Sequence, residues 1–100
     1  MESWTLEDFQ RSLERDEKSA FYLHAKMCGT CQVASKMLTI AEQVVPNIPI
    51  GEADLNYVEQ VAYDYEIESV PCLLIQKNGE ITHKIYAFQS VPHLVEKLTE

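Results

Sequence analysis

The sequence predicts an α/β domain in which helices flank a mixed four-stranded sheet. Two stretches carry this prediction. Residues 20–55 contain a strand pattern, a helix pattern and a second strand pattern, which is the order of a βαβ unit. Residues 72–100 contain two strand patterns joined by a tight turn and then a helix pattern, which is a ββα unit. The chain has no recognisable linker, so residues 1–100 are predicted to form one domain.

A helix is predicted ahead of these two units. Thr5-Leu6-Glu7-Asp8 resembles a capping box, in which the hydroxyl of Thr5 and the carboxylate of Asp8 each accept a hydrogen bond from the other residue's backbone. Leu6, Phe9 and Leu13 follow at helical spacing and mark one apolar face. We therefore expect the first helix to begin immediately after Thr5.

The βαβ unit begins at Ala20–Ala25, a short, aromatic and mostly apolar run that is typical of a buried strand. Polar and apolar residues alternate at helical period in Cys31–Val45, which predicts an amphipathic helix. Its polar stripe consists of Gln32, Lys36, Thr39 and Gln43, and its apolar side of Val33, Met37, Ile40, Ala41 and Val44. Ile48–Leu55 is predicted as the next strand, followed by a helix that Asn56 caps and that continues to about Tyr65.

The ββα unit is organised around a predicted two-residue turn. Asn78-Gly79 supplies the residues that tolerate the positive φ angles of a primed turn, so Cys72–Gln76 and Glu80–Tyr86 are expected to pair as a hairpin. Ser90 is a suitable cap for the last helix. The apolar face of that helix is predicted to contain Val91, Leu94, Val95 and Leu98.

Composition excludes several classes of function. The net charge of −8, from 16 acidic and 8 basic side chains, repels phosphate backbones and anionic lipid headgroups, so neither nucleic acid nor a membrane is an expected partner. The first residues lack the pattern of a secretory signal, and no apolar run approaches about 18 residues, so we expect a cytoplasmic protein. We also expect it to be a monomer. Three cysteines in such a chain are inert, metal-binding or redox-active rather than structural disulfides.

The motif that carries chemistry is Cys28-Gly29-Thr30-Cys31, which lies between a predicted buried strand and a long helix. Residues three apart at a helix start lie roughly 5 to 6 Å apart, within reach of a disulfide. Cys28 precedes the helix, where free N–H groups favour a thiolate, so we assign it as the nucleophile. Cys31 is the resolving thiol, and Gly29 keeps the approach to Cys28 open.

At this point the chain resembles the thioredoxin family over nearly its whole length. The resemblance rests on the Cys-x-x-Cys motif, on Ser69-Val70-Pro71 ahead of a Leu-Leu-Ile strand, and on Lys77-Asn78-Gly79-Glu80 in the hairpin. The family's usual first strand is not recognised here, so the expected fold is thioredoxin-like with an N-terminal helix and four strands. The resemblance implies that the Val70–Pro71 bond is cis, faces the cysteines and offers the Val70 backbone to an extended substrate segment.

The resemblance also implies a dithiol–disulfide oxidoreductase that serves cell redox homeostasis and electron transport. It would reduce or exchange disulfides of proteins or of low-molecular-weight compounds without a cofactor. Disulfide-containing proteins are its expected substrates, and thioredoxin reductase or a low-molecular-weight thiol is its expected electron donor.

The chain departs from the family's pattern at four positions near the motif. Met27 stands where thioredoxins carry a tryptophan, and Thr30 replaces a proline and restores an N–H that stabilises a thiolate, which predicts a less reducing potential. Tyr22 stands in place of a buried aspartate, and Glu52 stands near the position of its lysine partner. Glu52 either relays the proton of Cys31 or is an ordinary strand glutamate.

The third cysteine and the histidine nearest the motif have two interpretations each. Cys72 is either a third redox thiol or a small buried core residue, and His24 either tunes the thiolate or is simply a partly exposed strand end. Cys28, Cys31, Cys72 and His24 together would make a zinc site, although a second close ligand pair is lacking. The remaining rival is a redox-inactive or redox-sensing thioredoxin-like module that only binds other proteins.

Overall fold

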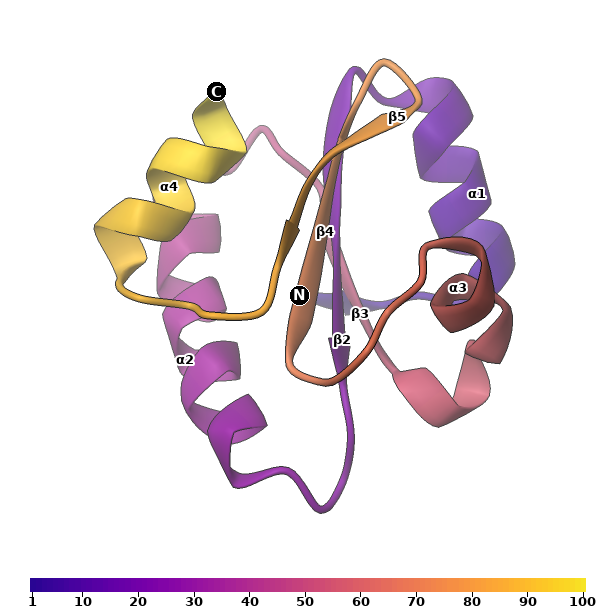
Figure 1. Cartoon of the computed structure of the whole chain (residues 1–100). Helices are drawn as coiled ribbons and strands as arrows, with labels where there is room; N and C mark the ends of the chain where they lie inside the picture. Colours follow the sequence, from indigo (N-terminus) through magenta and orange to yellow (C-terminus); the bar gives the residue numbers. More distant parts are fainter.

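Five strands form one mixed sheet in the order β1-β3-β2-β4-β5 (Figure 1). The computed structural model describes residues 1–100. β1, β3 and β2 are mutually parallel, whereas β4 and β5 run antiparallel to their neighbours. The strands are β1 (Glu2–Ser3), β2 (Lys18–His24), β3 (Ile50–Asp54), β4 (Cys72–Lys77) and β5 (Glu80–Ile85).

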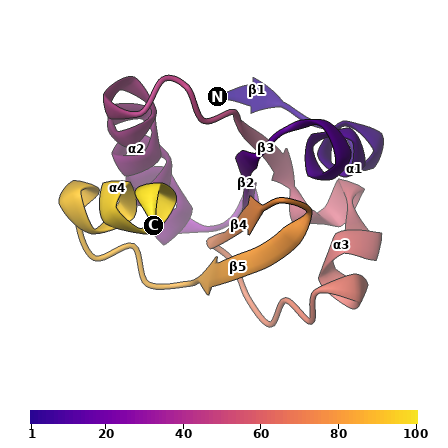
Figure 2. The same ribbon diagram turned by 90° about the horizontal axis from the view of Figure 1, so that it is seen from above.

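Helices cover both faces of this sheet. α2 and α4 lie on one face, and α1 and α3 lie on the other (Figures 1 and 2). The helices are α1 (Leu6–Arg15), α2 (Gly29–Val44), α3 (Glu59–Asp64) and α4 (Val91–Thr99), with a 3₁₀ turn, η1, at Leu55–Tyr57. No helix combines the length and apolarity needed to cross a membrane. The expected α/β class, with a βαβ unit followed by a ββα unit, is confirmed.

The prediction of a four-stranded sheet without a first strand is wrong. Glu2 and Ser3 form a short parallel strand against Gly51 and Glu52, and the N–H of Trp4 donates a 2.9 Å hydrogen bond to the carbonyl oxygen of Glu52. Two exposed polar residues show no periodicity, so nothing in the sequence marks them as a strand. They are extended because the free edge of β3 offers them backbone partners.

Side-chain capping places the starts of α1 and α4 as predicted. Thr5 and Asp8 form the expected capping box at α1, and the hydroxyl of Ser90 accepts a hydrogen bond from the His93 N–H at α4. The prediction that Asn56 caps a helix is wrong. The side chain of Asp54 instead accepts the Asn56 N–H at 2.9 Å, which starts η1, and α3 begins only at Glu59.

Two apolar clusters fill the space between the sheet and its helices. The cluster under α2 and α4 is centred on Tyr22, Leu38 and Leu73, and the cluster under α1 and α3 on Phe9, Phe21 and Leu74. Neighbouring strand residues face opposite clusters, as the period of a strand requires.

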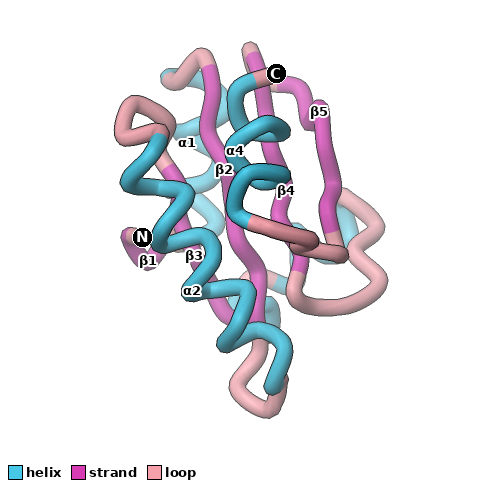
Figure 3. The backbone as a smooth tube through the Cα atoms, turned by 90° about the vertical axis from the view of Figure 1, so that its left-hand side faces the viewer, coloured by secondary structure: helices cyan, strands magenta, loops and turns pink.

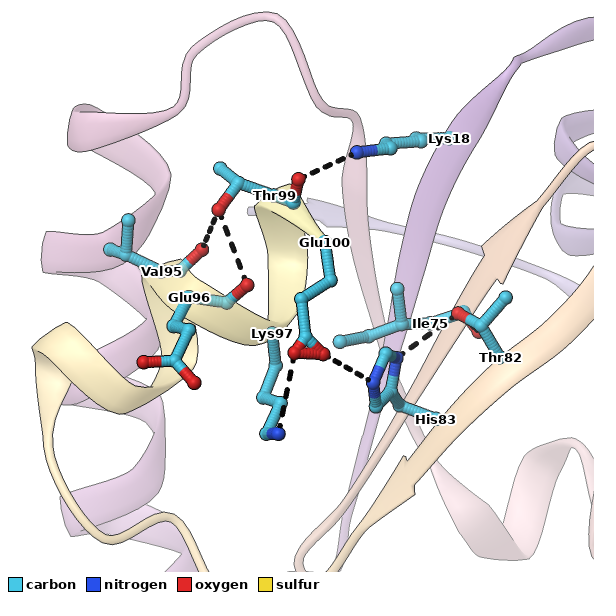
Figure 4. Close-up of polar contacts among 9 residues, drawn as sticks. All are labelled: Lys18, Ile75, Thr82, His83, Val95, Glu96, Lys97, Thr99 and Glu100. Carbon is cyan, nitrogen blue, oxygen red and sulfur yellow. Dashed lines mark hydrogen bonds and ion pairs between the residues drawn. The ribbon is translucent and has the colours of Figure 1, made fainter.

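The C-terminus is tied to the sheet by polar contacts (Figure 4). Glu100 lies 3.1 Å from Nε2 of His83 on β5, and Lys97 also reaches its carboxylate. Lys18 on β2 donates a 3.1 Å hydrogen bond to the carbonyl oxygen of Thr99. These contacts hold the end of α4 beside the sheet, with its length running next to α2 (Figure 3).

Candidate active site

Cys28 and Cys31 form a disulfide at the point where β2 gives way to α2. Their Cα atoms are 5.3 Å apart, as expected for residues in the first turn of a helix. Cys28 is the N-cap of α2, and its Sγ atom accepts a 3.2 Å hydrogen bond from the N–H of Cys31. The helix start therefore places an N–H donor next to the Sγ atom of Cys28.

The two cysteines differ in their access to solvent. Cys28 is half-buried, whereas only 3% of Cys31 is exposed. The hydroxyl of Thr30 lies 3.5 Å from Sγ of Cys28, and Gly29 has no atom near the position that a Cβ would occupy. An incoming molecule therefore meets Cys28 first, across a small and open turn.

The loop ahead of β4 faces this pair. The Val70–Pro71 peptide bond is cis, as the resemblance implies, and the carbonyl oxygen of Val70 lies 3.9 Å from Sγ of Cys28. Beside them lies an apolar groove of about 380 Å³. It is lined by Thr30, Val33, Ala34, Met37, Pro71, Tyr86, Ala87 and Phe88. We call this the Pro71 groove.

Tyr22 supports the pair from the sheet side. Its hydroxyl donates a 2.7 Å hydrogen bond to the carbonyl oxygen of Cys31 and accepts one of 3.1 Å from the hydroxyl of Ser35. Burial raises the pKa of Tyr22, so the phenol stays protonated near neutral pH and acts as a donor. Sequence reasoning noticed Tyr22 as a departure from the family but missed these two partners.

Glu52 and His24 form a pair with each other. Nε2 of His24 lies 3.2 Å from Oε1 of Glu52, and both side chains are between a quarter and a third exposed. His24 ends β2, and Glu52 is in the middle of β3. Both line a separate cleft of about 610 Å³ that includes Trp4. The His24 ring packs 5.4 Å from the ring of Tyr22. Glu52 therefore lies beside Tyr22, the residue that supports the cysteine pair, and its polar partner is His24.

Cys72 lies in the opposite apolar cluster. It is fully buried, and burial raises the pKa of its thiol to about 12. Such a thiol is protonated and shielded, which agrees with the core interpretation of this residue. No group of three or more His, Cys, Asp or Glu side chains is arranged to hold a metal ion, so the geometry gives the zinc hypothesis no support.

Comparisons with known proteins agree with this arrangement. The thioredoxin family model matches residues 1–100. The thioredoxin-like protein YusE of Bacillus subtilis is 41% identical over 85 residues, which cover 85% of this chain and 80% of that protein. Thioredoxin Y of rice chloroplasts is 27% identical over 96 residues, which cover 94% of this chain and 57% of that protein.

Solved structures support the same fold. The oxidised form of mitochondrial thioredoxin 3 from Saccharomyces cerevisiae superposes with a TM-score of 0.87 at 21% identity, covering 99% of this chain and 93% of that one. The family match, the 41% identical relative and the Cys28–Cys31 pair together indicate a thiol–disulfide oxidoreductase kind of function. The chain belongs to the thioredoxin family.

Proposed function

We propose that this protein reduces or exchanges disulfides of proteins or of low-molecular-weight compounds, with Cys28 as the nucleophile and Cys31 as the resolving thiol. The observation that carries the proposal is a disulfide between an accessible Cys28 and a shielded Cys31, opposite the Val70–Pro71 loop. A structural disulfide would gain little from closing a loop of two intervening residues. A cysteine pair at a helix start can open and close its disulfide without unfolding of the protein.

The reaction proceeds in two exchanges. The thiolate of Cys28 attacks one sulfur of the substrate disulfide, forms a mixed disulfide and releases the first substrate thiolate. Cys31 loses its proton, attacks Sγ of Cys28 and releases the second substrate thiolate. The substrate gains two electrons and two protons, and the protein ends with the Cys28–Cys31 disulfide. An external thiol or dithiol, such as that of a reductase, restores the reduced form.

The neighbours of the pair are suited to these steps. The N–H of Cys31 and the hydroxyl of Thr30 both lie close enough to Sγ of Cys28 to stabilise negative charge there. Because a stabilised thiolate favours the reduced form, we propose a less reducing potential than that of a general thioredoxin. Titration of the Cys28–Cys31 pair against glutathione measures it. Val70 offers its backbone to an extended substrate beside Pro71.

Proton removal from Cys31 is the step for which Glu52 is proposed. Its contact with His24 places a second titratable group beside it, and Tyr22 lies between this pair and Cys31. A Glu52→Gln variant tests the relay. The pH profile of mixed-disulfide resolution should shift if Glu52 takes the proton, and an unchanged profile would make Glu52 an ordinary strand residue.

Two cysteine variants separate catalysis from simple binding. With insulin as substrate and dithiothreitol as electron donor, Cys28→Ser should abolish the activity above background. Cys31→Ser should accumulate a mixed disulfide through Cys28, which mass spectrometry detects. A redox-inactive binding module would give no insulin reduction in the unmodified protein and no trapped species in Cys31→Ser.

A further inference from the structure

α2 carries an apolar stripe of which three of the four residues are exposed. We call Val33, Met37, Ile40 and Val44 the α2 stripe. Their spacing of four, three and four residues places them on one side of the helix. Val33 is 61% exposed, Ile40 52% and Val44 57%, so three of the six large apolar side chains that the molecule exposes lie here.

Packing within the domain explains only Met37, which is half-buried against the cluster under α2 and α4. The side of α2 that faces the sheet is made by other residues, namely Cys31, Ala34, Leu38 and Ala41, which are all buried. No other element covers the outer side of the helix (Figure 3). β-Branched residues are also poorer helix formers than lysine or glutamate at exposed positions. Val33, Ile40 and Val44 therefore cost helix stability and solvation, and a contiguous exposed apolar patch indicates a partner.

The stripe is continuous with the reactive site. Val33 and Met37 belong both to the stripe and to the Pro71 groove, which starts at Thr30 beside Cys28. From Cys28 to Val44 the helix rises about 24 Å, at about 1.5 Å per residue. An extended chain covers that length with about seven residues. One segment of a substrate is thus long enough to leave Cys28, cross the Pro71 groove and lie along the stripe.

The charge along α2 favours an apolar occupant over a basic one. The chain has a net charge of −8, yet α2 contains one acidic side chain, Glu42, which pairs with the N-terminal ammonium group of Met1, and one basic side chain, Lys36. A basic partner would gain nothing from this helix. A second copy is also disfavoured, because the few exposed side chains of the stripe fall far short of the roughly 800 Å² per partner that a stable dimer buries.

We infer that the α2 stripe docks an apolar segment of a disulfide-bearing protein substrate, within about seven residues of the cysteine that Cys28 attacks. The inference rests on the proposed function and adds a determinant of substrate choice to it. Low-molecular-weight disulfides do not reach the stripe, so only substrates with a neighbouring apolar segment benefit.

The test uses two peptides, each with one cysteine joined by a disulfide to glutathione and an eight-residue tail on both sides. One has tails of alternating Leu and Ser, and the other has tails of Ser alone. Reduced protein is mixed with each peptide, quenched with acid and alkylated, and mass spectrometry follows the formation of the Cys28–Cys31 disulfide. The double variant Ile40→Gln with Val44→Gln is compared with a control, Thr39→Gln with Gln43→Asn, at exposed positions of the same turns.

The unmodified protein should react about tenfold faster with the Leu peptide than with the Ser peptide, given the apolar area that two or three aliphatic side chains bury. The control should keep this preference, and the stripe variant should reduce it to about twofold or less. Equal rates for the two peptides, or the same preference in the stripe variant, would overturn the docking surface and leave the proposed function intact.

Two further outcomes also count against the inference. If the unmodified protein oxidises with neither peptide nor with oxidised glutathione, the proposed function fails and the docking surface fails with it. If light scattering shows a dimer of the unmodified protein that the stripe variant dissociates, a second copy occupies the stripe in place of a substrate.

Discussion

The hydroxyl of Tyr22 donates a 2.7 Å hydrogen bond to the carbonyl oxygen of Cys31. This bond joins the central strand β2 to the first turn of α2, and Ser35, one turn further along, donates to the same hydroxyl. The buried phenol thereby fixes the position of the helix start that carries the two sulfurs. Its role is to position Cys31, since it remains protonated and contacts the backbone rather than the sulfur.

Replacing Tyr22 with Phe should lower the free energy of unfolding by about 1–2 kcal/mol, because a buried carbonyl oxygen and the Ser35 hydroxyl each lose a partner. Urea unfolding of the oxidised protein measures this loss. The pH profile of disulfide exchange between about pH 6 and 9 should keep its shape, because a raised pKa means that the phenol does not titrate in that range. A displaced profile would mean that Tyr22 takes part in proton transfer.

Cys72 should be inert in the folded protein. Its thiol is fully buried and its pKa is raised to about 12, so very little thiolate exists at pH 8. Iodoacetamide should leave the oxidised native protein unlabelled and should add one group after unfolding in urea, counted by mass spectrometry. A Cys72→Ala variant should retain insulin reduction, and loss of that activity would reveal a redox role for the third thiol.

The sequence was sufficient to predict most of the fold because local signals and burial agree. The Thr5–Asp8 capping box, the Asn78-Gly79 turn and the apolar run of β2 each determine one structure, and each is present as expected. Asn78 and Gly79 both have positive φ angles, of 55° and 87°. β1 was missed because its two residues are extended only through pairing with β3, which is a tertiary effect.

The candidate site was predictable only in part. Cys28, Cys31 and Pro71 stand in recognisable motifs, whereas the partners of Tyr22 and the exposure of Ile40 and Val44 depend on how α2 is rotated against the sheet. Helical periodicity alone predicts one apolar face for α2, which contains Val33, Met37, Ile40, Ala41 and Val44. Of the predicted residues Ala41 does face the sheet, together with Ala34 and Leu38, whereas Val33, Ile40 and Val44 are exposed.

Replacing Gly51 with Ala should destabilise the protein by about 1–3 kcal/mol, as expected for overpacking. A Cβ atom there would collide with the ring of Trp4, and β3 is held between β1 and β2 and has no room to move. Thermal unfolding measures the effect. Gly29→Ala is the matched control, because no atom lies within 4 Å of its Cβ position, and Trp4→Leu in the Gly51→Ala background should restore part of the stability.

The capping box of α1 should make stability depend on pH in acid. The backbone N–H of Thr5 donates to the Asp8 carboxylate at 3.0 Å, and this bond, with help from Arg11, lowers the pKa of Asp8 below its ordinary value of 3.8. A group whose pKa is lowered by folding stabilises the native state above its unfolded pKa, and this contribution is lost as the pH falls through the folded value.

Asp8→Asn keeps an oxygen acceptor at the same position but removes the charge. Urea unfolding between about pH 2.5 and 6 should therefore show the unmodified protein as more stable above about pH 4, with the two curves converging as Asp8 becomes protonated. Thr5→Ala is the control, because it removes the hydroxyl, at a typical cost of about 1 kcal/mol, while the Thr5 N–H still donates to Asp8. It should keep most of the pH dependence of the unmodified protein, because the backbone bond is the largest cause of the lowered Asp8 pKa and the Thr5 hydroxyl is a smaller one. Parallel curves for Asp8→Asn and the unmodified protein would show that the carboxylate contributes nothing as a charge.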